Sequence, residues 1–121
     1  YLSTSEVKGA TLILAEIAKV MRVELMGRQK QAHFDLANIQ TALQVPDSAC
    51  SERVRDEVLM RADLSAARAM AWMEEPVVKG LNFHLEALSH AFQAFEYYEV
   101  VHRRPDTVES WLLACKNGGS Q

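Results

Sequence analysis

The chain has 121 residues, of which 49% are hydrophobic and 24% charged, and these are values of a globular domain rather than of a disordered segment. Its net charge is −3, and its Lys and Arg residues are scattered among acidic ones, so we expect no nucleic-acid partner. No stretch is long and apolar enough to span a bilayer. We predict a single helical domain over 1–121 with a flexible tail at 116–121. Because the chain starts at Tyr1 rather than Met, we expect an excised or processed domain.

The first predicted helix begins at Ser3, which has the spacing of a capping box with Glu6. It ends at Gly27, unless the helix continues through this glycine at a cost of about 1 kcal/mol. Most apolar residues of this helix, Ile13 and Val20 among them, cover the side expected to pack within the chain. Leu12 and Val23 fall on the opposite, polar side, where the sequence offers them no partner within the chain. Both are therefore candidate partner-binding residues.

Two further helices are predicted in the middle of the chain. The second covers 29–44 and stops before Pro46, because the residue preceding a proline avoids the α conformation. The third covers 51–75, with Ser51 as its N-cap. It has a broad apolar face and a narrow face of mostly small side chains, and Pro76 ends or kinks it.

The fourth predicted helix lies between Gly80 and Arg103 and holds most of the aromatic residues of the chain. At 100° per residue, its apolar side chains cover an arc of about 200°, twice the stripe of a one-sided surface helix. One edge of the arc is expected in the core, and it consists of Leu81, Leu85, Leu88, Phe92 and Phe95. The other edge is expected either to pack under a short last helix that starts at Asp106 or to bind a partner, and it includes Phe83, Tyr97 and Val101.

These segments predict an all-α fold, an antiparallel bundle of about four helices plus a short C-terminal helix. The bundle turns at Gly27, at Pro46 and between Pro76 and Gly80. The alternative is a long helical hairpin that turns only at Pro46 and dimerises. We favour the bundle because it covers the wide aromatic arc within one chain. No strand is predicted, since no run alternates between apolar and polar residues.

Cys50 and Cys115 are distant in sequence and have no C-x-x-C spacing. We therefore favour two free thiols over a disulfide. Free thiols, together with the lack of a visible signal or membrane-spanning segment, favour a cytoplasmic location.

Arg28 and His33 have an Arg-x4-His spacing that resembles the motif of HEPN ribonucleases, which are all-α domains of similar length. The resemblance covers six residues and implies a cation and a general base acting on RNA. His33 with Asp35 and Asn38 also resembles the phosphoacceptor helix of histidine phosphotransfer domains.

The other histidines do not form a metal site in the sequence. Glu99 and His102 have ExxH spacing, but no second such pair accompanies them, and His84 lies too far from His102 to share an ion. We expect no metal and no cofactor.

The sequence therefore favours a non-enzymatic protein–protein interaction module, such as an adaptor, an oligomerisation domain or an assembly subunit. Its partner would be another protein or a second copy of the chain. The candidate contact residues are Phe83, Tyr97, Val101, Trp111, Leu12 and Val23. The alternative function is a small HEPN-like ribonuclease or a histidine phosphotransfer-type domain centred on Arg28 and His33.

Overall fold

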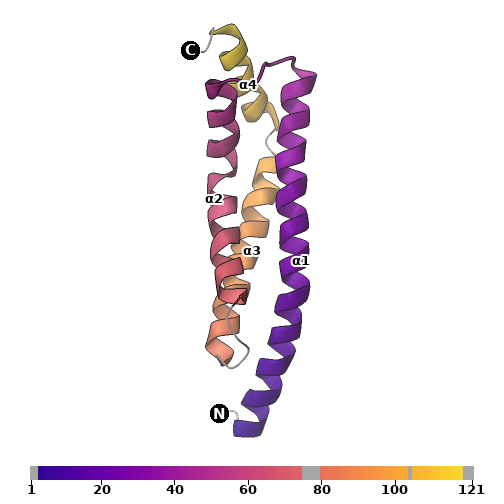
Figure 1. Cartoon of the computed structure of the whole chain (residues 1–121), viewed down its shortest axis with the longest axis vertical. Helices are drawn as coiled ribbons and strands as arrows, with labels where there is room; N and C mark the ends of the chain where they lie inside the picture. Colours follow the sequence, from indigo (N-terminus) through magenta and orange to yellow (C-terminus); the bar gives the residue numbers. More distant parts are fainter. Residues whose placement is uncertain (1–2, 75–79, 104, 119–121) are drawn as a thin grey trace.

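A computed structural model describes residues 3–74, 80–103 and 105–118, and over this part of the chain it contains helices and no strand. The helices are α1 (Thr4–Ala42), α2 (Ala49–Met73), α3 (Leu81–Arg103) and α4 (Pro105–Asn117). Helix α2 runs back alongside α1, α3 returns beside both, and α4 lies at the end where α1 meets α2 (Figure 1). The prediction of an all-α helical bundle is confirmed.

Helix α1 is continuous for 39 residues, so the predicted break at Gly27 is wrong. Leu25 and Leu36 lie on either side of this glycine, and both are fully buried against the other helices. Burying two leucines stabilises the helix by more than the roughly 1 kcal/mol that one internal glycine costs. The long hairpin is also wrong, because α2 and α3 are separate helices packed along each other. The predicted break at Pro76 lies outside the described residues.

The helix starts show which cap predictions hold. Ser3 and Glu6 form the predicted capping box: the Glu6 amide donates to Ser3 Oγ at 3.1 Å, and the Ser3 amide donates to Glu6 Oε2 at 2.9 Å. Ser51 is not the N-cap of α2. Ser48 takes that position, and Ser51 completes a second box three residues later. Gly80 precedes α3 with φ +67°, a conformation that glycine adopts without strain.

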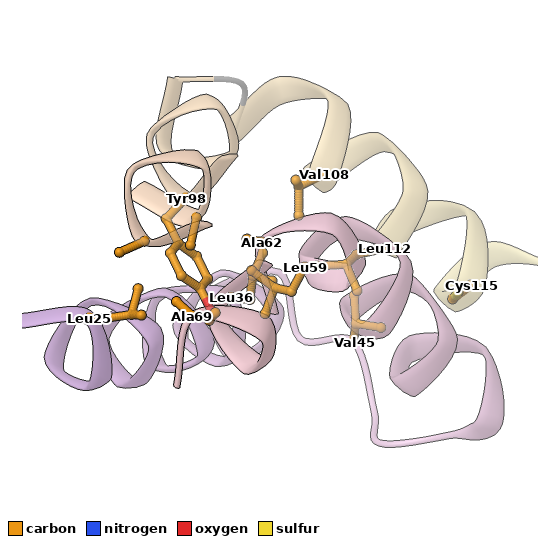
Figure 2. Packing of buried hydrophobic residues seen from close by; sticks show 13 residues of the cluster. Leu25, Leu36, Val45, Leu59, Ala62, Ala69, Tyr98, Val108, Leu112 and Cys115 are labelled. Atoms are coloured by element: carbon orange, nitrogen blue, oxygen red, sulfur yellow. The ribbon is translucent and has the colours of Figure 1, made fainter. Parts of the chain in front are cut away.

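The core depends on small side chains where α2 and α3 meet. Helix α2 contributes Ala62, Ala66 and Ala69, and α3 contributes Ala91 and Ala94, all at 1% exposure or less. Alanine faces let two helix backbones approach closely, as the sequence of the third predicted helix suggested. The larger core residues fill the space around this contact (Figure 2) and include Leu25, Leu36, Leu59, Tyr98 and Leu112.

The buried side of α3 is the middle of the predicted arc rather than its first edge. Leu85 and Phe92, expected in the core, are 48% and 57% exposed. The buried residues of this helix are His84, Ala87, Leu88, Ala91, Ala94 and Tyr98. Because alanines occupy the centre of the arc, α2 packs there, and the bulky residues on both edges are left less covered.

Cys50 at the start of α2 and Cys115 near the end of α4 form a disulfide, with their Cα atoms 5.6 Å apart. The prediction of two free thiols is wrong because antiparallel packing brings two distant segments to one end of the bundle. The cytoplasmic location loses the support that it drew from those thiols. None of the described helices is long and apolar enough to cross a membrane.

The C-terminal segment is held against the end of α1. Lys116 Nζ donates a hydrogen bond to the carbonyl oxygen of Leu43 at 3.1 Å, and α4 remains helical to Asn117. Of the tail predicted at 116–121, residues 119–121 lie outside the described residues.

Candidate interaction surface

The side of α1 that faces away from α2 and α3 carries a row of exposed apolar side chains. The positions of this row are four and three residues apart in alternation, so they lie on one line along the helix. The same spacing occurs along the contact line of a coiled coil. We call this row the α1 stripe, and it comprises Gly9, Ile13, Glu16, Val20, Val23, Gly27, Lys30 and Phe34. The exposed fractions of its large apolar members are 63% for Ile13, 69% for Val20, 73% for Val23 and 60% for Phe34.

Among the described residues the stripe is uncovered, because the buried side chains of α1 lie on its opposite side and include Ala15, Ala18, Leu25 and Leu36. The N-terminal end of α1 also projects past the ends of α2 and α3 (Figure 1). A Cβ atom added at Gly9 or at Gly27 would meet nothing within 4 Å. Neither glycine is therefore required for packing inside the chain, and each leaves a gap in the stripe.

The six predicted contact residues divide into two groups. Leu12, Val23 and Trp111 are exposed, at 56%, 73% and 47%. Val23 lies on the α1 stripe and Leu12 lies beside it. Trp111 is on α4, which contacts the C-terminal end of α1.

The predicted residues of α3 are half-buried. The ring of Phe83 packs edge-on against Trp72 with centroids 4.2 Å apart. Tyr97 and Val101 pack against the hydrophobic core. The structure thus does not gather the six residues on one surface.

Sequence reasoning missed Ile13, Val20 and Phe34 as surface residues. Ile13 and Val20 were assigned to the buried side of the first helix, and Phe34 was separated from them by the predicted break at Gly27. The spacing that continues unbroken through Gly27 is the signal that could have revealed the row.

Arg28 and His33 point to different neighbours within the chain. Arg28 Nε donates to Glu24 Oε1 at 3.2 Å, and its guanidinium lies 5.2 Å from the centre of the Phe95 ring on α3. The half-exposed His33 instead has Nε2 2.9 Å from Asp63 Oδ2 on α2. The two side chains do not converge on one site in a single copy.

Asp63 is the centre of a polar cluster that joins three helices. Besides contacting His33, it accepts hydrogen bonds at Oδ1 from the Tyr98 hydroxyl, at 2.5 Å, and from Gln29 Nε2, at 3.1 Å. Burial of the phenol, followed by the hydrogen bond to the carboxylate and its negative charge, raises the pKa of Tyr98. The cluster is satisfied within the chain, which indicates a structural role.

A groove of about 750 Å³ lies between α1 and α3. Its lining includes the apolar residues Leu36, Ile39 and Val101 together with the charged residues Glu24, Arg28, Asp35 and Glu99. No group of three or more His, Cys, Asp or Glu residues in the described part of the chain could hold a metal ion.

No known protein family, curated protein or solved structure matches this chain.

Proposed function

We propose that this chain is a protein–protein association module that binds through the α1 stripe. The single observation that carries the proposal is a line of positions at coiled-coil spacing on a long helix, four of which hold exposed β-branched or aromatic side chains: Ile13, Val20, Val23 and Phe34. A row of this kind exceeds the isolated surface hydrophobics that a monomer normally shows. Pairing with another helix is the mode of recognition that matches the row.

Composition supports the same function. The net charge of −3 does not favour a nucleic-acid partner. The Asp63 cluster and the Arg28 and His33 side chains are paired within the chain. Helix α1 carries more exposed large hydrophobic residues than any other described helix, and four of them lie on the stripe.

Site-specific photo-crosslinking tests the proposal. A photo-crosslinking amino acid placed at Val20, in cells that make the protein, is expected to form an adduct with another polypeptide. The same amino acid at Glu57, exposed on α2, is the matched control and is expected to form none. The adduct at Val20 should disappear when Val23→Asp is added to the same chain. No adduct at Val20 above the Glu57 background would overturn the proposal.

A second candidate function is RNA cleavage or phosphoryl transfer at His33. One observation favours it, the hydrogen bond that His33 Nε2 donates to the Asp63 carboxylate, which orients a half-exposed imidazole in an arrangement that general bases use. His33→Ala separates the two functions. Loss of a nuclease or phosphotransfer activity with an unchanged circular dichroism spectrum would support catalysis, and full activity would exclude it.

The cytoplasmic location stays a prediction, and measuring the redox state of Cys50 and Cys115 in cells tests it. A cytoplasmic location requires free thiols at Cys50 and Cys115, because that compartment keeps thiols reduced. Alkylation of intact cells before lysis should then modify both residues. If neither is modified until a reductant is added, the protein occupies an oxidising compartment.

A further inference from the structure

The α1 stripe differs between its two halves in both charge and size. The N-terminal half contains the small residue Gly9 and the acidic Glu16, and the C-terminal half contains the large Phe34 and the basic Lys30. Val20 and Val23 lie in the middle. A surface whose halves complement each other fits a copy of itself turned end to end.

We propose that the occupant of the α1 stripe is a second copy of this chain, with the two α1 helices antiparallel and a two-fold axis between Val20 and Val23. This inference rests on the proposed function and names the partner. In this register Val20 of one copy packs on the partner's Val23, and Phe34 packs into the gap at the partner's Gly9. At Gly27 the gap accommodates the partner's Glu16.

Charge decides between the two possible orientations. In the antiparallel pair Glu16 lies one helical turn from the partner's Lys30, within reach of its ammonium group. In a parallel pair Glu16 would face a second Glu16, and Lys30 a second Lys30. Glu16 also pairs with Lys19 of its own helix at 3.0 Å, but both side chains are exposed, and such a pair contributes little.

The sizes of the side chains also favour the antiparallel orientation. A parallel pair sets two Phe34 rings against each other and leaves empty space between facing pairs of glycines. The antiparallel register matches each gap with a larger side chain, as close packing requires.

The extent of the stripe indicates a weak dimer. From Gly9 to Phe34 it is roughly 38 Å long at helical rise, and with a helix about 10 Å wide the two faces cover roughly 800 Å². This is below the roughly 1,200–2,000 Å² of stable specific interfaces and within the range of weak, transient ones, so a dissociation constant on the order of micromolar or weaker is expected.

Sedimentation equilibrium of the pure chain tests the proposal. The wild type should be dimeric above its dissociation constant. Val20→Asp should raise that constant at least about a hundredfold, because each dimer contains the substitution twice in its centre. Val20 is 69% exposed, so the monomer fold should survive, and an unchanged circular dichroism spectrum checks this. Glu57→Lys is the matched control on α2 and should leave the constant unchanged.

Charge exchange tests the orientation. Glu16→Lys and Lys30→Glu should each raise the dissociation constant about tenfold, since each dimer contains two such pairs. The two changes in one chain should restore the wild-type value. In a parallel pair each single change replaces one like-charge contact by another and leaves the dissociation constant unchanged, and that result would overturn the antiparallel register.

The outcomes separate this inference from the proposed function. A chain that is monomeric at several hundred micromolar overturns self-pairing. If the Val20 photo-adduct then contains a different polypeptide, association through the stripe still stands. If no adduct forms, both proposals fail. A dimer that persists in Val20→Asp uses another surface, and this too overturns the inference.

Discussion

The Cys50–Cys115 disulfide offers the sharpest test of how this bundle is held together. It closes a loop with a sequence separation of 65 residues and joins the start of α2 to the end of α4. The perturbation is Cys50→Ala with Cys115→Ala, which removes the cross-link and changes little volume. Loss of the bond gives the unfolded chain back the conformational freedom that the closed loop denied it.

The loop length sets the magnitude. The chain-entropy relation gives an entropy difference of about 14 cal/mol/K, or about 4 kcal/mol at 25 °C. Part of this is offset where the unfolded chain is already compact, so we expect a loss of between about 2 and 4 kcal/mol in the free energy of unfolding. With a urea m-value of about 1.5 kcal/mol/M, the midpoint should fall by roughly 1.3–2.7 M.

Urea titration followed by circular dichroism measures this loss. The oxidised wild type is compared with the double variant and with reduced wild type. The two forms without the cross-link should unfold at similar urea concentrations, because Cys115 is buried and alanine fills most of its space. Thiol titration of the unfolded protein should find no free thiol before reduction.

Two results would refute the reasoning. Two free thiols in the purified, unreduced protein would show that the bond does not form. A midpoint shift below about 0.5 M, with the bond present in the wild type, would show that loop closure does not stabilise this fold.

Two further predictions concern the core and the polar cluster. Leu59→Ala removes a fully buried side chain and should lower the free energy of unfolding by about 2–5 kcal/mol, as measured by urea unfolding. Met60→Ala changes the exposed neighbouring residue and is the control. Equal losses in the two variants would contradict the packing of Leu59 in the core. Tyr98 has a pKa raised above the ordinary value of about 10, so its contribution to stability is fully present below pH 10 and is lost as the pH rises through the folded-state pKa. The free energy of unfolding should thus decline above pH 10 in the wild type and decline less in Tyr98→Phe, while identical pH profiles would show that neither burial nor the hydrogen bond to Asp63 stabilises the protonated phenol.

The helical character of the chain could be predicted because it depends on local pattern. Ser3 and Glu6 cap α1 as expected, and Pro46 separates α1 from α2. The break at Gly27 was predicted wrongly because a glycine inside a helix lowers the stability of that helix. The burial of Leu25 and Leu36 against other helices offsets this loss, and local sequence does not reveal it.

The candidate site could be predicted only in part. Leu12 and Val23 were singled out because they fall on a polar side, and both are exposed. Val20 was assigned to the core because periodicity gives a direction on a helix but not the width of the side that a neighbour covers. Phe83 was expected on a binding face, but Trp72 covers it.

The sequence by itself therefore determined that the chain is helical, where its first helix is capped and that it turns at Pro46, since neighbouring residues decide each of these. The tertiary structure alone decided that α1 runs through Gly27, that alanines fill the centre of α3, and that Cys50 meets Cys115. Each of these depends on which segments pack side by side, and packing is a property of distant residues that periodicity does not encode. The exposed row on α1 follows from both, because its spacing is present in the sequence and its exposure is a result of the fold.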